Sequence, residues 1–199
     1  MNELDRSLML ALNFDGGGFM DAVMWFASGI PNWIPLYVIV LLLFWKFYGW
    51  RYMLFLLLAV GLGVGLCDQV CNFFKDNVAY LRPTHTDLLP DLHTLKGYYG
   101  GLMGTVSGHA STSMCVFIVT SLAMHKRWFT AIMCIYMVLT SYSRIYLGVH
   151  FPFQILFGWI LGIGVSALIW YVFSKLNASY HWARPAGGSG SSADGGAAA

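Results

Sequence analysis

The sequence predicts an all-α membrane protein, a polytopic helical bundle of about five transmembrane helices with an amphipathic helix at the N-terminus. Composition is the first reason: 58% of the 199 residues are hydrophobic and 10% are charged, against roughly 25% charged in an ordinary soluble domain. The second is a set of apolar runs long enough to cross a hydrocarbon core ~30 Å thick. These runs cover residues 31–47, 52–74, 109–124, 128–147 and 152–174, and the third is the shortest.

A short amphipathic segment precedes the first run. Its apolar residues recur at helical spacing and would share one face, whereas its charged residues lie off that face. The apolar face consists of Leu4, Leu8, Ala11 and Leu12. The charged residues off it are Glu3, Asp5 and Arg6. Because the segment is too short to span a bilayer, we expect an interfacial helix.

Short connections and the lack of an internal repeat predict a single membrane domain over residues 1–184. Residues 185–199 are rich in Gly, Ala and Ser and have almost nothing to bury, so we expect a flexible low-complexity tail or linker. We expect the bilayer and a lipid to be the partners and expect no nucleic acid. The sequence leaves the oligomeric state open.

Charge placement predicts the orientation in the membrane. If all five runs cross, six basic residues fall on one side: Lys46, Arg51, Lys126, Arg127, Lys175 and Arg184. The opposite side carries Glu3, Asp5, Asp15 and Asp21 against Arg6 and Lys96. By the positive-inside rule the first side is cytoplasmic. In a bacterium the chain would lie in the inner membrane, with its second side facing the periplasm.

Polar clusters stand at the edges of the apolar runs on this outer side. In the first cluster, Lys75 and Arg82 are seven residues apart, which is about 10 Å along a helix. The second cluster begins the third run, where Ser107 would cap a helix and Gly108 would let a ligand approach the backbone. His109 follows at this positive helix end, which favours an anion.

A third cluster joins the end of the fourth run to the start of the fifth. Ser143 and Arg144 close the fourth run, and His150 stands just ahead of Pro152, a normal first residue of a helix. Each cluster alone has a simpler interpretation, such as a snorkelling cation, an ordinary capped helix or a hydrogen-bonded boundary histidine. Together they offer cations, amides and two histidines at one membrane surface, which predicts a site for a phosphorylated headgroup.

With these residues, the chain resembles the type-2 phosphatidic acid phosphatase superfamily from Lys75 to Gln154. The first block of that family's signature, a lysine, six residues and Arg-Pro, is complete. The second block is usually Pro-Ser-Gly-His, and here Val106 replaces the proline without removing a chemical group. The third block, Ser-Arg, five residues, His, three residues and Asp, ends here on Gln154 instead of the aspartate.

The resemblance implies a membrane lipid phosphatase that works through a phosphohistidine. His150 would attack phosphorus, His109 would protonate the leaving oxygen, and water would hydrolyse the intermediate. The residues implied to hold the phosphate oxygens are Lys75, Arg82, Ser107, Gly108 and Arg144. Preplaced cations and amides can stabilise a transferring phosphoryl group, so we expect no metal or cofactor. Candidate substrates are undecaprenyl diphosphate, lipid A, phosphatidylglycerol phosphate and phosphatidic acid.

Gln154 belongs with the catalytic residues because an aspartate there would fix the tautomer of His150 and stabilise its growing positive charge. Glutamine offers a carbonyl oxygen without charge, and the matching change in a serine-protease triad costs ~10⁴ in turnover. Three explanations stay open: natural divergence, a substitution introduced to trap a ligand, or rescue by Asp87 or Asp91. Two rival functions also stay open, a weakly catalytic protein that binds or moves lipid phosphates and a phosphotransferase with a non-water acceptor.

Two other features each have two interpretations. Asp68 lies inside the second run with Asn72 between it and Lys75, which favours a polar ladder supporting Lys75 over a proton path. The connection between the second and third runs, of about 25 residues, is longer than a bundle needs. It is either a reader of the lipid headgroup or a mobile lid.

Overall fold

The computed structural model describes residues 3–78 and 80–180, and these residues confirm the all-α class. The α-helices are α1 (Glu3–Leu12), α2 (Gly17–Ser28), α3 (Ile34–Tyr48), α4 (Trp50–Asn77), α5 (Gly108–Met124), α6 (Arg127–Tyr146) and α7 (Pro152–Tyr180). Three short 3-10 helices are η1 (Ile30–Trp33), η2 (Pro83–His85) and η3 (Leu89–Asp91). The expected tail, residues 185–199, and Arg184 lie outside the described residues.

Each of the five apolar runs forms a helix within a few residues of its expected bounds. Among the described residues, 30–48 (η1 with α3), α4 and 152–179 of α7 are long and apolar enough to span a membrane. α5 is apolar but has only 17 residues, and α6 has 20 residues but is less apolar. The chain is an integral membrane protein, and a count of five crossings stays a prediction for α5 and α6.

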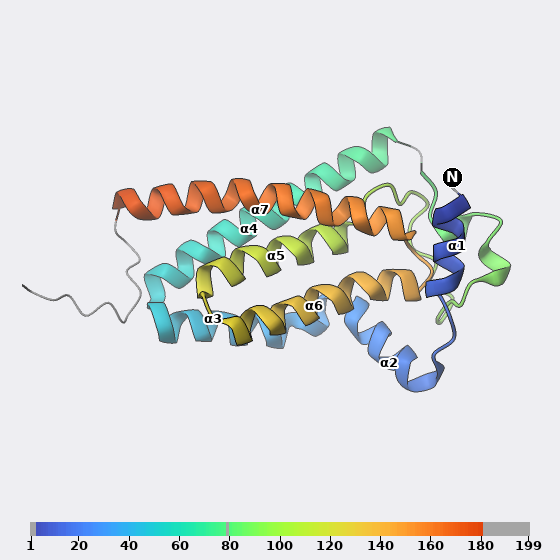
Figure 1. The fold of residues 1–199 in the computed structure, drawn as a ribbon, viewed down its shortest axis with the longest axis horizontal. Coiled ribbons are helices and arrows are strands. Elements are labelled where there is room, and N and C mark those ends of the chain that lie inside the picture. The colour runs from blue at the N-terminus through green and yellow to red at the C-terminus, as the bar shows by residue number, and fades with distance from the viewer. Residues whose placement is uncertain (1–2, 79, 181–199) are drawn as a thin grey trace, which may run out of the picture.

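Helices α3 to α7 lie roughly along the long axis of the molecule, and successive helices run in opposite directions (Figure 1). α5 packs against α4, α6 and α7, so it occupies the centre of the bundle. At one end of the bundle α4 and α6 finish while α5 and α7 begin, and we call this the site end. The turns at Gly49 and His125 lie at the other end, with the basic residues Lys46, Arg51, Lys126 and Arg127 around them.

Two glycines bring α5 and α7 into close contact near the site end. A Cβ added at Gly158 would stand 2.7 Å from the carbonyl oxygen of Ser107, and one at Gly162 would stand 2.6 Å from that of Ser111. Small residues at this four-residue spacing let two membrane helices approach backbone to backbone. The contact fixes the start of α5 relative to the first turns of α7.

α1 crosses the site end of the bundle (Figure 1). Asp5 and Met9 are fully buried, whereas Leu4 and Leu12 of the predicted apolar face stay exposed. Asp5 is buried because it caps α7: its Oδ1 accepts a hydrogen bond of 3.0 Å from the backbone N–H of Phe153 in the first turn of that helix. The interfacial position of α1 stays a prediction.

α2 was not predicted from the sequence, because its 12 residues follow a run of glycines and are too few to span a bilayer. It packs against α6 at the site end. The connection between α4 and α5 also packs there. Its Leu88 and Leu92 are buried in one cluster with Met9, Ile145 and Phe151. This connection is therefore part of the packed structure rather than a set of solvated side chains.

Candidate active site

A cavity of about 580 Å³ opens among the helices and reaches the site end. Six of the eight residues proposed from the sequence line it: Lys75, Arg82, Gly108, His109, Arg144 and His150. The other two, Ser107 and Gln154, are buried directly behind the wall. Away from these groups the lining is mostly apolar and includes Trp33, Val40, Phe44, Leu56, Val60 and Val116. The cavity therefore joins a strongly polar end to an apolar interior.

Lys75 stands in the last turn of α4, at the polar end of the cavity. Its Nζ donates to Asn72 Oδ1 at 3.4 Å, and Asn72 Nδ2 donates to Asp68 Oδ2 at 3.2 Å. These bonds confirm the polar ladder expected along one face of α4. The carboxylate of Asp68 reaches Lys75 only through the Asn72 amide. The Lys75 ammonium group therefore has no direct ion-pair partner in Asp68 and can bind an anion in the cavity.

Arg82 is held by backbone carbonyls rather than by acids. Its Nε donates to the carbonyl of Met103 at 3.0 Å, and one terminal nitrogen donates to the carbonyl of Val149 at 3.3 Å. Gly104 makes this position possible, because a Cβ there would lie 2.7 Å from Arg82 Cγ. Burial, with the guanidinium of Arg144 second, lowers the pKa of Arg82 from its ordinary value, yet the group stays charged at any physiological pH.

The second block opens α5 as expected. Ser107 Oγ accepts the N–H of Ala110 at 3.4 Å and so caps the helix, while the N–H of Ser107 donates to the carbonyl of Gln154. The cap orients Gly108 and His109 toward the cavity, where both contribute to the lining. Because its hydroxyl is buried in the cap, Ser107 acts on the site through the start of α5.

Arg144 is almost fully buried, and its hydrogen-bond partners come from two segments far away in the sequence. It donates to Ser28 Oγ at the end of α2 and to the hydroxyl of Tyr98 at 3.1 Å in the α4–α5 connection. Its Nε has no partner among the described residues. The backbone N–H of His150 donates to the carbonyl of Arg144 at 3.1 Å, so one turn of chain positions both residues.

Gln154 fixes the orientation of His150. Its Oε1 lies 2.9 Å from His150 Nδ1 and accepts the N–H of Phe151 at 3.2 Å, while its Nε2 donates to the carbonyl of Leu81 at 3.2 Å. The donor and acceptor partners together define the amide orientation, so Nδ1 of His150 carries the proton. The free lone pair of the imidazole is then on Nε2, which suits attack on an electrophile.

Among the described residues, neither Asp87 nor Asp91 contacts His150 to replace the missing charge. Asp87 forms an ion pair with Arg6 at 2.7 Å, and its side chain is 72% exposed. Asp91 is also exposed. Burial is the main factor that lowers the pKa of His150 well below its ordinary value, and the guanidinium groups of Arg82 and Arg144 act in the same direction. His150 is therefore a neutral imidazole at neutral pH.

Comparison of the chain with known proteins identifies its family. A family model of the PAP2 superfamily matches residues 48–178, which contain all three blocks. The chain belongs to the PAP2 superfamily. It is 30% identical over 193 residues to a lipid A 4'-phosphatase of Bacteroides thetaiotaomicron, covering 96% of this chain and 86% of that protein. It is 33% identical over 175 residues to a lipid A 4'-phosphatase of Porphyromonas gingivalis, covering 86% and 73%.

Two solved PAP2-type structures share the fold. The PAP2-type phosphatidylglycerolphosphate phosphatase of Bacillus subtilis matches with a TM-score of 0.67 at 23% identity, over 87% of this chain and 86% of that one. LpxE of Aquifex aeolicus matches with a TM-score of 0.64 at 26% identity, over 84% and 95%. The resemblance drawn from the sequence blocks is thereby confirmed, and so is the helical membrane fold.

Sequence reasoning did not assign a role to two residues of this PAP2 site, Ser28 and Tyr98. Ser28 lies at the end of the unpredicted α2, where its hydroxyl accepts from Arg144 and its backbone is hydrogen-bonded to His109. Tyr98 lies in the α4–α5 connection, which the sequence analysis considered only as a whole. The signal available was weak, because neither residue belongs to a block and each reaches the site over a long sequence separation.

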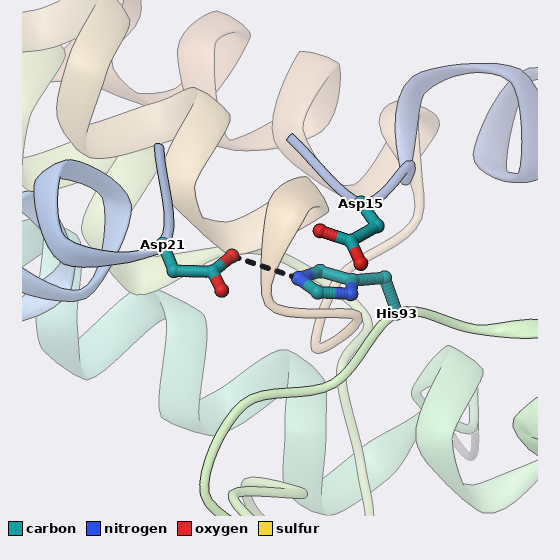
Figure 2. Close-up of side chains that lie close together, drawn as sticks. All are labelled: Asp15, Asp21 and His93. Atoms are coloured by element: carbon teal, nitrogen blue, oxygen red, sulfur yellow. Dashed lines mark hydrogen bonds and ion pairs between the residues drawn. The ribbon is translucent and has the colours of Figure 1, made fainter. Parts of the chain in front are cut away.

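One group outside the cavity has ligands that a metal ion could use. Asp15, Asp21 and His93 each offer one ligand atom, and these atoms lie within 4.8 Å of one another (Figure 2). The side chains already have partners within the chain. Asp21 Oδ1 accepts from the hydroxyl of Tyr146 at 2.6 Å and lies 3.0 Å from His93 Nε2. These bonds favour a structural role for the group.

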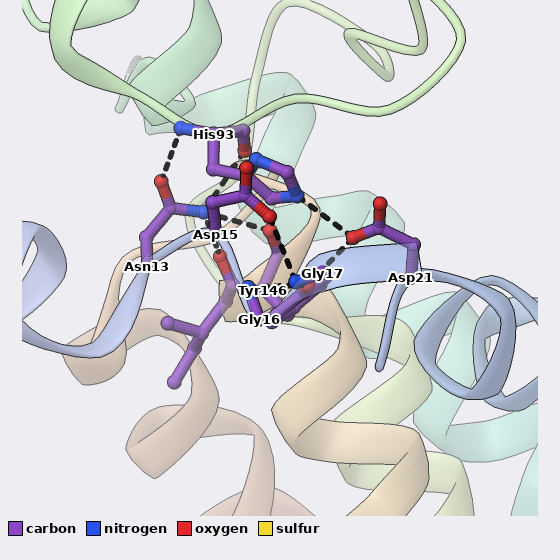
Figure 3. Close-up of polar contacts among 8 residues, drawn as sticks. Asn13, Asp15, Gly16, Gly17, Asp21, His93 and Tyr146 are labelled. Atoms are coloured by element: carbon purple, nitrogen blue, oxygen red, sulfur yellow. Dashed lines mark hydrogen bonds and ion pairs between the residues drawn. The ribbon is translucent and has the colours of Figure 1, made fainter. Parts of the chain in front are cut away.

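Figure 3 shows how the same network joins three segments of the PAP2 domain. Asn13 Nδ2 donates to the carbonyls of Ile145 and Tyr146 at the end of α6, and Asn13 Oδ1 accepts the N–H of His93 at 2.7 Å. The link between α1 and α2 is thus tied to both the α4–α5 connection and the end of α6. Because Arg144 and His150 flank this end of α6, the network helps to position both residues.

Proposed function

We propose that this PAP2-type membrane phosphatase removes a phosphate from a membrane lipid through a covalent phosphohistidine. The observation that carries the proposal is unbalanced positive charge in the cavity. The ion pairs among the described residues are Arg6–Asp87 and His93–Asp21, so Lys75, Arg82 and Arg144 have none. These three cations outnumber the one carboxylate of the lining, Asp68, which reaches Lys75 only through Asn72, and their excess charge matches that of a phosphate.

The two histidines divide the chemistry. His150 Nε2 attacks phosphorus, the bond from phosphorus to the lipid oxygen breaks, and the proton of His109 goes to that oxygen. Water then attacks the phosphohistidine with His109 as base, which releases phosphate and restores His150. The unpaired Nε of Arg144 gains a phosphate oxygen as its acceptor, while Ser28 and Tyr98 hold the rest of the guanidinium. These steps run through groups of this chain alone.

The apolar part of the cavity supports a lipid substrate. Lining residues on α5 run from Gly108 to Thr120, which spans about 18 Å of helix. One hydrocarbon chain of the substrate would occupy this space while the phosphate stays at the polar end. The two lipid A 4'-phosphatases, at 30% and 33% identity, match over most of this chain, so lipid A is the first substrate to test. The basic residues at the opposite end favour a periplasmic site in a bacterial inner membrane.

The direct test measures phosphate release by the purified protein from lipid A, phosphatidic acid, phosphatidylglycerol phosphate and undecaprenyl diphosphate. His150→Ala should abolish release from any accepted substrate, whereas His109→Ala should slow release and leave binding intact. His125→Asn is a matched control, because His125 lies at the opposite end of the bundle in a left-handed conformation that asparagine tolerates. Radiolabelled lipid phosphate should label the wild-type protein covalently but not His150→Ala. Normal turnover in His150→Ala would refute the mechanism.

Gln154 favours a second candidate function. In this alternative the protein binds or moves lipid phosphates and hydrolyses them only slowly. The Gln154 amide holds His150 but supplies no charge to stabilise the imidazolium. Phosphate release by Gln154→Asp beside the wild type separates the two, since a large gain indicates hydrolysis impaired by the missing charge. Inactivity of both proteins, with binding retained, would support the binding function. Analysis of the products with alcohol acceptors present tests phosphotransfer.

A further inference from the structure

A second cavity of about 220 Å³ adjoins the phosphate site. It is lined by Trp25, Ser28, Gly29, Asn32 and Tyr98, which come from α2, η1 and the α4–α5 connection. Ser28 and Tyr98 line the main cavity as well, so the two spaces share a wall. These are the same two residues that hold Arg144. A group in the second cavity would therefore lie directly beside the phosphate.

Arg144 determines which hydrogen bonds the shared wall, Ser28 and Tyr98, can offer to a ligand in the second cavity. A guanidinium can only donate, so the hydroxyls of Ser28 and Tyr98 must both accept from it. Their own hydrogens stay available to donate to a ligand. Asn32 Nδ2 donates to the carbonyl of Phe26 at 2.8 Å, and its Oδ1 has no donor among the described residues. The cavity thus offers two hydroxyl donors and one carbonyl acceptor.

The aromatic part of the wall is held in a fixed arrangement. The rings of Trp25 and Tyr98 lie 6.0 Å apart at 87°, and the Nζ of Lys96 lies 4.6 Å from the centre of the Trp25 ring. None of the five lining residues is charged. Lys96 packs against the Trp25 ring but does not line the cavity, so a second phosphate would find no charged lining residue. An uncharged ring bearing hydroxyls would find both polar partners and flat apolar surfaces.

We propose that the second cavity binds the sugar ring that carries the scissile phosphate, and that Trp25 and Asn32 make the protein selective for phosphorylated glycolipids over phosphorylated glycerolipids. The proposal rests on the proposed function, because the main cavity must hold the phosphate of the same lipid. Phosphatidic acid presents the same phosphate monoester on glycerol and would leave the second cavity empty. The two lipids therefore differ in the contact that Trp25 provides.

The test compares lipid A with phosphatidic acid, using kcat/KM for phosphate release and, in the non-hydrolysing His150→Ala background, equilibrium binding. The wild type should prefer lipid A, and Trp25→Ala should lower both its kcat/KM and its affinity for lipid A by about tenfold, the loss of one aromatic contact. Values for phosphatidic acid should change less than about twofold. Trp25→Phe keeps a ring and should recover most of the loss. Trp128→Ala, an exposed tryptophan at the far end of α6, is the control.

The outcomes separate the two proposals. Equal losses on both lipids for Trp25→Ala, or no loss on either, would overturn the sugar site, as would failure of Trp25→Phe to recover lipid A binding. If the wild type releases phosphate from neither lipid but binds lipid A more tightly through Trp25, the sugar site stands and the phosphatase proposal fails. If the wild type releases phosphate from phosphatidic acid and shows no preference for lipid A, the phosphatase proposal stands and the sugar site fails.

Discussion

Replacing Gln154 by leucine tests whether the amide controls the reactivity of His150. Leucine has nearly the same volume, so the change removes hydrogen bonds without leaving a large cavity. Two buried groups, Nδ1–H of His150 and the N–H of Phe151, would lose their acceptor, and the partly exposed carbonyl of Leu81 would lose its donor. At about 1–3 kcal/mol for each unpaired buried group, the free energy of unfolding should fall by about 2–6 kcal/mol.

The stability effect is measured by thermal unfolding in detergent, where a change of that size lowers Tm by roughly 5–20 °C. Turnover should fall by more, on the order of 10²–10⁴, because the imidazole is free to adopt the wrong tautomer. Gln69→Leu is the matched control, since Gln69 is exposed on α4. Wild-type turnover in Gln154→Leu, measured below its own Tm, would refute the role of Gln154 in orienting His150.

Gln154→Glu separates orientation from charge. A carboxylate can accept from His150 and Phe151 as the amide does, and it adds a negative charge beside the imidazole. That charge favours the protonated ring, so the pKa of His150 should rise and the acid limb of kcat/KM should move to higher pH. At pH above that limb, kcat should exceed the wild-type value because the charge stabilises the growing imidazolium. A lower kcat across the whole pH range would contradict this reasoning.

Three further predictions concern the same end of the bundle. Gly104→Ala would place a Cβ 2.7 Å from both the arginine and the glutamine of the site and should lower kcat by about tenfold, whereas Gly101→Ala, with open space around it, should not. Because the pKa of His150 is lowered, the ring stays neutral as pH falls through 6.5, so the acid limb of kcat/KM should lie below that pH; a limb above it contradicts the inference. Asp5→Ala removes the cap on α7 and should lower Tm by roughly 3 °C, and Asp5→Asn should retain it.

Local pattern was enough to predict most of the membrane helices. Length and hydropathy defined the five apolar runs, and several of their boundaries lie at a proline, a glycine or the capping Ser107. The same criteria did not detect α2, because its 12 residues are too few to form the long apolar run that identifies a membrane-spanning helix. They also did not detect the cap that Asp5 gives to Phe153, since that bond joins residues far apart in the sequence.

The candidate site divides in the same way. The residues of the three blocks could be named from spacing, because helix ends at one membrane surface must meet. The partners that orient them could not be named, since Ser28 and Tyr98 reach Arg144 from segments with no motif. The double role of Gln154 was hidden as well. Its carbonyl matches the acceptor expected of an aspartate, but its bond to Leu81 requires an N–H that no carboxylate has.

The close contact between α5 and α7 limits how the protein can open. His109 is carried by the first turn of α5, and His150 directly precedes α7, so Gly158 and Gly162 hold the two imidazoles in one rigid unit. A lipid cannot enter by separating these helices without dismantling the reacting pair. Any motion that admits a bulky substrate must therefore involve the other elements that line the cavity, namely α2, η1, α3, α4, α6 and the α4–α5 connection.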